Sequence, residues 1–551
     1  MMGWCERLKI MTDTWRVVNN SVTLDVQLPV IFVTKHGLLR STAIFGSMTF
    51  LSRIAGFVRD LLQASLFGTG AAVSAFVVAY RIPNYLRRIF AEGSFSSAFV
   101  PVLSELKEKG DDAQVQDFLD HIAGALLAVV LVVTALGIAL APLIAQIFLA
   151  FADKDSEQVA LTASMLRITF PYLIFISMTA MSGAVMNSFR HFGLPAFIPV
   201  LHNLAIILAM LGLAQYFDIP AYALAWGVFL AGLLQLCVMW PAMARFGFRP
   251  RLRLDFRHPG VQRVFKLMIP TIFSSSVAQL NLLVGTVFAS LLVANAQSWL
   301  YYSDRLTEFP LGLFGVAIGT VILPHLSRQH AAEDRQGYSH ALDWGLKMVC
   351  LIGVPAAVGL VILAEPLCAS LFQYGKFTLE DTRMVAAAIS AMSIGIPAFM
   401  LSKVLLPAFF SRHDTKTPMK VAIYTVLVNV LLIVALVTPM WLHGSPVAHT
   451  GIALATALAG IFNAAALWWC LRREGVYTPE PGWLNWMLRI GVACLAMTAV
   501  VLLIRWHVGD WRLLPGLRRI VWLLAAVAAG GAAYMASHWV FGLRLRHLRE
   551  V

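Results

Sequence analysis

The sequence predicts an all-α integral membrane protein with fourteen transmembrane helices. Of its 551 residues, 59% are hydrophobic and only 13% are charged, whereas a soluble domain is about 25% charged. Apolar runs of about 20 residues, the length that crosses a bilayer as an α-helix, recur along the chain. The strict alternation of apolar and polar residues that is typical of a transmembrane β-barrel is absent, so a helical bundle is the expected fold.

Residues 1–36 differ from the rest of the chain and are expected to be a disordered extension or to precede the true start. They are largely polar, and the apolar stretch at 22–33 is too short to span a bilayer and lacks the order of a signal peptide. The expected transmembrane helices lie at 40–66, 73–104, 121–149, 162–189, 195–216, 220–243, 267–293, 298–326, 341–373, 385–411, 418–441, 449–471, 483–506 and 518–541.

Lysine and arginine are concentrated in the connections that follow even-numbered segments and in the C-terminal tail. The most basic connection, 245–266, contains Arg245, Arg249, Arg251, Arg253, Arg257, Arg263 and Lys266. By the positive-inside rule, both ends of the chain are expected in the cytoplasm. This bias also accounts for the net charge of +13, so no nucleic-acid partner is expected.

Two sequence matches indicate that the halves on either side of this connection are related. VPVLSEL at 100–106 is similar to LPHLSRQ at 323–329, and SFRHFGLP at 188–195 is similar to FSRHDTKTP at 410–418. Because each half holds six segments, the repeat is expected to be parallel, about an axis along the membrane normal.

The predicted domains are therefore two pseudo-symmetric six-helix lobes around a central cationic cavity, followed by two extra helices. The N-lobe covers 37–244, the basic linker 245–266 and the C-lobe 267–473, and the last two helices with a basic tail cover 474–551. The cores of the last two helices are uncharged, which suits a cargo with a long apolar part. A scaffold role or an oligomer contact is the alternative for this helix pair.

Charged residues inside the predicted segments are the main functional signal. In the first half they are Arg53, Arg59, Asp60, Arg81, Arg87, Arg88 and Glu92, with Asn84 on the same helix stripe. In the second half they are Asp304, Arg305, Glu308 and Lys403. A charge at the bilayer centre costs about 2.5–3.5 kcal/mol on insertion scales, so these side chains are expected to face a water-filled cavity. Because arginines dominate, and their planar fork grips phosphate oxygens, an anionic cargo is expected.

Other interpretations of these charges stay open. The arginines and carboxylates could form a salt-bridge network that holds helices together, and Asp60 and Glu92 could pair with arginines when no cargo is bound. Arg59 and Lys403 could instead reach an interface by snorkelling. Asn203 is expected to be a hydrogen-bond partner between helices rather than a ligand.

The sequence contains no motif that points to catalysis or to a metal. HExxH and GxxxxGK[ST] are absent, and the short outer loops hold no paired carboxylates, which disfavours a membrane glycosyltransferase. The six cysteines are scattered without a pairing pattern, so neither a disulfide nor a metal site is expected.

Four runs carry a resemblance to a known family: SRIAGFVRD at 52–60, YRIPNYLRRIFAEGSFSSAFVPVLSEL at 80–106, WLYYSDRLTEFPLGLFGVAIGTVILPHLSR at 299–328 and LFQYGKFTLEDT at 371–382. From residue 37 to near the C-terminus, the chain resembles the MurJ (MviN) lipid II flippases of bacteria. They belong to the multidrug/oligosaccharidyl-lipid/polysaccharide exporter superfamily. The resemblance implies two six-helix lobes and two extra helices that border a hydrophobic groove.

The resemblance also implies a function. The chain would move lipid II, the undecaprenyl-diphosphate-linked disaccharide-peptide, across the bacterial cytoplasmic (inner) membrane by alternating access, for cell wall biosynthesis. It implies that the cavity arginines that bind the diphosphate and headgroup are Arg53, Arg59, Arg87 and Arg305. The neighbouring charged positions that match are Asp60, Arg88, Glu92, Asp304 and Glu308.

The sequence departs from the family at one position and leaves the coupling mechanism open. Where the family usually has an Asp in a TDAF-like stretch, this chain reads VSAF with Ser74, so a role of that Asp in gating or ion coupling is in question here. No cofactor is expected, and coupling to the membrane potential or to a monovalent cation is left open because no ion ligands can be assigned. Expected partners are lipid II, membrane lipids and the peptidoglycan-synthesis machinery. The alternative function is export of another amphiphilic or drug-like substrate in the same superfamily.

Overall fold

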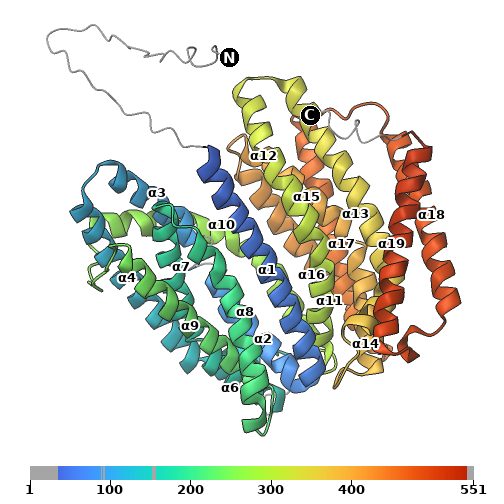
Figure 1. The fold of residues 1–551 in the computed structure, drawn as a ribbon, viewed down its shortest axis with the longest axis horizontal. Helices are drawn as coiled ribbons and strands as arrows, with labels where there is room; N and C mark the ends of the chain where they lie inside the picture. Colours follow the sequence, from blue (N-terminus) through green and yellow to red (C-terminus); the bar gives the residue numbers. More distant parts are fainter. Residues whose placement is uncertain (1–34, 89, 91–93, 152–156, 543–551) are drawn as a thin grey trace, which may run out of the picture. The chain divides into compact units, whose positions relative to one another are not determined.

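The computed structural model of the protein describes residues 35–88, 90, 94–151 and 157–542 (Figure 1). The chain divides into two units between Ala43 and Ile44, and the first unit is described only from Lys35 onward. The expected extension at 1–36 therefore lies almost wholly outside the described residues. None of the described residues lies in a β-strand, in agreement with the predicted all-α fold.

The helices follow one another along the whole described chain. Those before the basic linker are α1 (Lys35–Phe67), α2 (Ala71–Arg87), α3 (Ser94–Glu108), α4 (Asp112–Ala139), α5 (Ala141–Phe148), α6 (Glu157–Thr169), α7 (Tyr172–Ser188), α8 (Gly193–Leu213), η2 (Ala214–Tyr216) and α9 (Tyr222–Arg245). Those after it are α10 (Pro259–Ala289), α11 (Ala296–Pro310), η3 (Leu311–Gly315), α12 (Val316–Ala331), α13 (Arg335–Leu371), α14 (Leu379–Ser393), α15 (Ile396–Phe410), α16 (Lys416–Leu442) and α17 (His449–Arg473). The last are α18 (Trp483–Val508), η4 (Trp511–Leu513) and α19 (Gly516–Val540).

Each predicted transmembrane segment falls on one of these helices or on a consecutive pair. By length and composition, 10 spans in the described residues could cross a membrane, or up to 11 if α14 and α15, bent by 44°, form one span. The protein is thus a multi-pass membrane protein. The remaining predicted segments fall on α1, on α2 with α3, and on α10, so the count of fourteen stays a prediction.

Several predicted segments are broken helices with a local cause. Pro310 lacks a backbone N–H, and the turn that follows it, η3, is a π-helix. Between α14 and α15 stands Gly395, where a Cβ would lie 2.7 Å from the Cα of Ala457. The glycine therefore allows the start of α15 to approach α17 closely.

The helices pack in two groups. In the first helix group, α2–α9, close pairs are α8 with α9, α7 with α9 and α2 with α6. In the second helix group, α11–α17, they are α16 with α17, α13 with α14 and α11 with α14. Helix α10 contacts members of both groups, and α18 packs on α19 while both contact α13. In Figure 1 the first group runs from blue to green and the second from yellow to orange.

The basic linker is shorter in the structure than the predicted 245–266. Helix α10 begins at Pro259, inside the expected linker 245–266, because proline suits the first helical turn and His258 caps it. The linker packs on α4, where the backbone N–H of Arg253 donates to the backbone oxygen of Asp120 (3.1 Å). A Cβ on Gly124 would lie 2.1 Å from the backbone oxygen of Arg253, so this contact needs a glycine.

The end of α1 and the turn after it contact both α11 and the connection between α13 and α14. The backbone N–H of Lys376 donates to the oxygen of Ser65 (2.8 Å), and the Tyr302 hydroxyl donates to the oxygen of Gly68 (3.3 Å). Gly68 and Gly375 have φ of +69° and +59°, and a Cβ on either would clash with the facing backbone at 2.7 and 2.2 Å. The end of α1 and the turn after it are therefore held against the second helix group by direct backbone contact.

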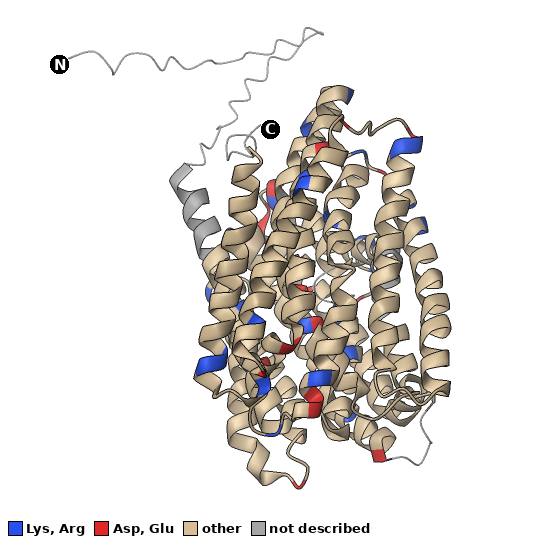
Figure 2. Cartoon of the chain, turned by 90° about the vertical axis from the view of Figure 1, so that its right-hand side faces the viewer, with Lys and Arg blue, Asp and Glu red and all other residues tan. Residues whose placement is uncertain are grey.

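Charged residues are sparse along most of the helices seen in Figure 2, which looks toward α18 and α19. Large apolar side chains on these two helices are exposed: Leu484, Leu488, Leu495, Leu503, Leu524 and Val527. Such a contiguous apolar surface is expected where helices face lipid.

Candidate functional site

Arg59 and Asp60 form a buried ion pair in the second half of α1. Nη2 of Arg59 lies 2.7 Å from Oδ1 of Asp60, and its Nε donates to the same oxygen at 3.1 Å. Nη1 of Arg59 donates to Oδ1 of Asn203 on α8 (3.0 Å), and Nδ2 of Asn203 donates to the backbone oxygen of Ser52 (3.1 Å). Asn203 thus bridges helices, and Arg59, only 8% exposed, is enclosed by protein rather than reaching an interface.

The Asp60 carboxylate is shared with α11. The Tyr301 hydroxyl donates to its Oδ1 (3.0 Å), and Nε of Arg305 lies 3.5 Å from its Oδ2. The Arg305 guanidinium also sits 5.0 Å from the centre of the Tyr301 ring, a cation–π contact. Two of the predicted cavity arginines, Arg59 and Arg305, therefore converge on one carboxylate from different helices.

Arg81 on α2 is held by neutral and acidic groups of α10 and α11. Its Nη1 donates to Oγ1 of Thr286 (2.6 Å) and to Oε1 of Gln297 (3.3 Å). Its Nη2 lies 3.8 Å from Oδ2 of Asp304. This geometry favours the network interpretation for Arg81, because its donors are directed at protein groups.

The rest of the predicted stripe on α2 is half-buried. Nε of Arg87 donates to Oδ1 of Asn84 (2.9 Å), one turn earlier on the same helix. Arg88 is half-buried as well. Glu92, the predicted partner of Arg88, lies outside the described residues.

Arg53 and Lys403 are the predicted cations that are exposed. Within the described residues, neither forms an ion pair. Nη1 of Arg53 lies 2.6 Å from where a Cβ on Gly312 would stand, so the guanidinium of α1 rests against the π-helical turn η3. Glu308, one helical turn after Arg305, is exposed and lies 3.5 Å from its Nη1. Arg53 and Lys403 thus place positive charge at accessible positions.

Ser74 occupies a buried contact between the two helix groups. Its hydroxyl oxygen lies 2.8 Å from that of Ser298 on α11, and the backbone N–H of Ser298 donates to it (3.3 Å). Beside this pair, Asp381 accepts from Trp299 Nε1 (2.9 Å) and from the Thr69 hydroxyl. A pair of neutral hydroxyls therefore joins α2 and α11 at this buried contact.

Sequence reasoning missed Asp381, although its local pattern is informative. Thr378 and Asp381 form a capping box at the start of α14, which the spacing T-x-x-D signals. The same carboxylate contacts Thr69 and Trp299, and no local pattern predicts those long-range partners.

A cluster of Asp117, His121 and His258 has donor atoms within 4.8 Å of one another, the arrangement of a metal site. Nδ1 of His258 accepts from the backbone N–H of Gly260 (3.2 Å), so the ring proton is on Nε2, which donates to Oδ2 of Asp117 (3.2 Å). A protonated ring nitrogen cannot ligate a metal. The cluster therefore fits a clamp between α4 and the start of α10 better than a metal centre.

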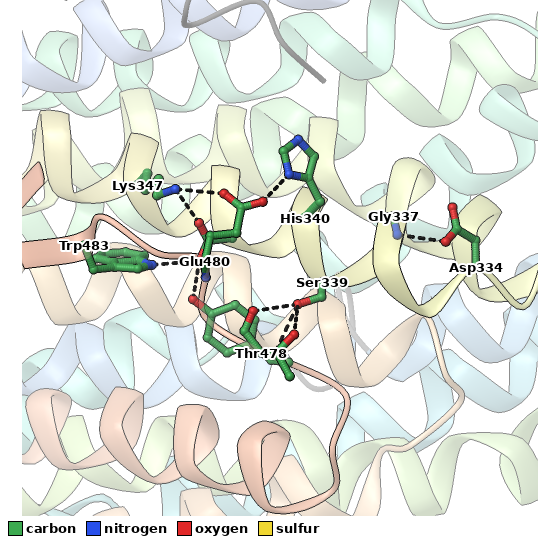
Figure 3. A network of polar contacts seen from close by, with 10 residues as sticks. Asp334, Gly337, Ser339, His340, Lys347, Thr478, Glu480 and Trp483 are labelled. Atoms are coloured by element: carbon green, nitrogen blue, oxygen red, sulfur yellow. Dashed lines mark hydrogen bonds and ion pairs between the residues drawn. The ribbon is translucent and has the colours of Figure 1, made fainter.

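The connection between α17 and α18 is fixed to α13 by a polar network (Figure 3). Nζ of Lys347 lies 2.6 Å from Oδ2 of Asp343 and 3.0 Å from Oε2 of Glu480. Oδ1 of the fully buried Asp343 accepts from the Tyr477 hydroxyl (2.6 Å) and from Nε1 of Trp483 (2.7 Å). These contacts fix the start of α18 against the second helix group.

Residues 63–517 match a family described as "Lipid II flippase MurJ". Over 516 residues the chain is 40% identical to a probable lipid II flippase MurJ of Haemophilus influenzae, covering 91% of this chain and 99% of that protein. Over 523 residues it is 39% identical to the lipid II flippase MurJ of Burkholderia cenocepacia, covering 93% and 99%.

The fold is similar to solved structures. A lipid II flippase MurJ in an inward closed conformation matches with a TM-score of 0.76 and 26% identity, over 91% of this chain and 98% of that chain. An inward-facing multidrug resistance MATE family transporter of the MOP superfamily matches with a TM-score of 0.61 and 13% identity, over 79% and 98%. The second likeness shows the fold alone.

Proposed function

Since the chain belongs to the lipid II flippase MurJ family, we propose that it translocates lipid II across the bacterial cytoplasmic membrane by alternating access, for cell wall biosynthesis. The family is one of transporters, and we propose no catalytic step for this chain. The anionic cargo expected from the arginines is consistent with a lipid-linked diphosphate.

One observation carries the proposal: Arg59 and Arg305 reach the same carboxylate, Asp60, from α1 and α11. A diphosphate offers more negative charge than Asp60, and it accepts paired hydrogen bonds from arginine forks. Arg305, whose side chain is 35% exposed, is accessible to such a competitor. We propose that the diphosphate takes Arg305 from Asp60.

The roles of the other charged residues are proposed from their hydrogen bonds and ion pairs. Arg53 is exposed and unpaired within the described residues, so it is proposed to bind the headgroup directly, together with Arg87. Arg81 is committed to Thr286 and Gln297 and is proposed to position helices. Asp304, Glu308, Asn84, Arg88 and Lys403 are proposed as the supporting polar network.

Alternating access also needs a gate. With both termini in the cytoplasm, as the distribution of basic residues favours, the α1–α2 turn lies at the outer face. The backbone contacts of Gly68 and Gly375, and the hydroxyl pair of Ser74 and Ser298, then close that face. We propose that these contacts break when the site opens outward.

The cargo has an apolar part as well as a headgroup. Helices α18 and α19 expose a row of leucines, and the network around Asp343 and Lys347 holds α18 against α13. We propose that the polyprenyl tail stays in lipid along these two helices while the headgroup crosses between the helix groups.

The test is complementation of bacteria depleted of their own lipid II flippase. The wild-type chain is expected to restore growth, and Arg53→Ala, Arg87→Ala and Arg305→Ala are expected to fail at equal membrane levels. Arg335→Ala, at the exposed start of α13, is the matched control and is expected to restore growth. Lipid II on the outer leaflet of spheroplasts, labelled with a membrane-impermeant reagent, gives a direct readout.

The competing function is export of another amphiphilic or drug-like substrate of the same superfamily. A wild-type chain that inserts correctly but exposes no lipid II on the outer leaflet would select this alternative.

A further inference from the structure

A polar pocket of about 420 Å³ lies between α13, α14, α18 and η4, where α18 leads into the connection to α19. Its described lining includes Arg383, Arg505 and Arg512, with Glu365 as the accompanying carboxylate. The pocket shares no lining residue with the Asp60 site, which is built from α1 and α11.

Two of these arginines are held by the surrounding backbone and by Glu365. Nη1 of Arg505 donates to the backbone oxygen of Ile362 (2.6 Å), and its Nη2 lies 3.6 Å from Oε2 of Glu365. Nε of Arg512 lies 3.1 Å from Oε1 of Glu365 and 2.8 Å from Oδ1 of Asp510. Both guanidinium groups are thus presented from fixed positions.

The connection that carries Arg512 is fixed by a fourth arginine, Arg519. Its buried guanidinium donates to the backbone oxygen of Arg512. It also donates, at 2.7, 3.0 and 3.3 Å, to the backbone oxygens of Leu514, Ala369 and Gln373. These partners are neutral carbonyl groups, so Arg519 adds a positive charge beside the pocket that no carboxylate of the described residues pairs with.

Among the arginines that line the pocket, Arg383 has the fewest interactions with the protein. In the described part of the chain it forms neither a hydrogen bond nor an ion pair, and its side chain is exposed. The Asp510 carboxylate also takes part in this charge balance, and it is held by hydrogen bonds from Arg512 that keep its pKa below the ordinary value. The cationic groups around the pocket outnumber the carboxylates, and a polar pocket with that excess favours an anion.

The chain around the pocket also carries large exposed apolar side chains. Trp506, Leu513 and Leu517 are 82%, 80% and 77% exposed. A tryptophan such as Trp506 at the end of a membrane helix is typical of the bilayer interface, the level at which lipid phosphates lie. The anion available to this pocket is therefore one carried by a lipid.

We propose that this pocket binds the phosphate group of a lipid, with Arg383, Arg505 and Arg512 as its ligands. Arginine forks donate paired hydrogen bonds to phosphate oxygens and keep their charge. Two sources share this chemistry: the headgroup of an anionic phospholipid and the diphosphate of a polyprenyl-linked lipid. The inference does not depend on the transport proposal, because the pocket can hold a lipid phosphate whatever the Asp60 site carries.

The test is native mass spectrometry of the full-length protein in detergent, titrated with phosphatidylglycerol, undecaprenyl diphosphate, inorganic pyrophosphate or diacylglycerol. Arg383→Gln is the main variant, because an exposed and unpaired side chain can be changed without disturbing the fold; its melting temperature verifies this. Glu365→Gln removes the carboxylate that competes with the ligand. Arg335→Gln, an exposed arginine on the opposite end of α13, is the matched control.

Arg383→Gln is expected to weaken binding of the phosphate lipids by about tenfold, the size of one charge-assisted hydrogen bond. Glu365→Gln is expected to tighten binding, and Arg335→Gln to leave it unchanged. If undecaprenyl diphosphate binds more tightly than phosphatidylglycerol, the ligand of the pocket is the polyprenyl lipid. If the two bind equally, the pocket accepts any anionic lipid. The proposal is overturned if Arg383→Gln has no effect, if diacylglycerol binds as well as phosphatidylglycerol, or if only pyrophosphate binds.

Discussion

The hydroxyl oxygens of Ser74 on α2 and Ser298 on α11 lie 2.8 Å apart, and both side chains are fully buried. This neutral pair joins the two helix groups at the end where Gly68 meets Lys376 through the backbone. A carboxylate at Ser74 would be a buried charge here, whereas two hydroxyls satisfy each other and separate at little cost. The pair therefore suits a contact that forms and breaks in every transport cycle.

A disulfide between cysteines at these two positions is expected to lock that end shut. The two hydroxyl oxygens, which sulfur atoms would replace, lie 2.8 Å apart, and a disulfide needs side chains that face each other at such short range. The double variant Ser74→Cys and Ser298→Cys should fail to complement flippase-depleted cells under oxidising conditions and recover when a reductant is added. Each single cysteine variant is the control. Growth supported by fully cross-linked protein would show that this contact need not open.

Asp60→Asn is expected to destabilise the protein rather than to affect only transport. It leaves Arg59, which is almost fully buried, without its counter-charge, and breaking such a pair costs about 3–5 kcal/mol. The measurement is the melting temperature of the purified protein, together with its level in the membrane. The conservative change Asp60→Glu keeps the charge and is expected to retain most of the stability. Equal melting of Asp60→Asn and wild type would mean that Arg59 finds another anion.

Arg53→Gln is expected to abolish transport without lowering the stability of the protein. Arg53 is exposed and has no ion-pair partner within the described residues, so its loss should leave the melting temperature close to that of wild type. Complementation should nevertheless fail, because the headgroup loses an accessible cation. Lys420→Gln, an exposed cation at the start of α16, provides the control for loss of charge alone. An Arg53→Gln protein that is stable and supports growth would remove Arg53 from the binding site.

The positions of the helices could be predicted from the sequence because bilayer thickness sets the length of each apolar run. Charged side chains such as Arg59 and Arg305 could be singled out for the same reason, since a charge inside an apolar run needs a compensating partner. Asp60, which both arginines contact, was singled out for the same reason. That Asp60 pairs with Arg305 could not be predicted, because the contact depends on how α1 and α11 come together.

The neutral residues that hold the charged side chains could not be predicted from the positions of charges in the sequence. Thr286 and Gln297 hold Arg81, and Tyr301 completes the Asp60 site, yet none of them stands out among ordinary polar residues of a membrane helix. The linker was predicted as a basic connection on composition, but its packing on α4 depends on the missing side chain of Gly124. Such close approaches are set by shape, which a hydropathy pattern does not record.

Lys347 and Asp343 are expected to be strongly coupled in a double-mutant cycle. Lys347→Met leaves the fully buried Asp343 carboxylate with only neutral donors, and Asp343→Asn leaves Lys347 with Glu480 alone. Lys347→Met strands the buried Asp343 carboxylate and should cost about 3–5 kcal/mol. Asp343→Asn should cost less, because the half-buried Lys347 keeps its ion pair with Glu480. The double variant strands no buried charge and should cost less than the sum of the two single changes. The free energy of unfolding in mild detergent measures this. Additive effects would mean that the network around α18 is solvated rather than buried.

Dissipating the membrane potential is expected to slow transport by hindering the reset of the empty carrier. The predicted site residues carry more positive than negative charge, and moving one elementary charge through 100 mV corresponds to about 2.3 kcal/mol. An inside-negative potential therefore favours the inward-facing state when no diphosphate neutralises the arginines. Lipid II exposed on spheroplasts should fall when an ionophore collapses the potential at constant external sodium. A second experiment, in which choline replaces sodium at constant potential, tests the alternative of cation coupling. If sodium drives transport, the amount of lipid II exposed on the outer leaflet would fall when sodium is removed. Exposure that is insensitive to the potential would show that the net charge of the site does not cross the field.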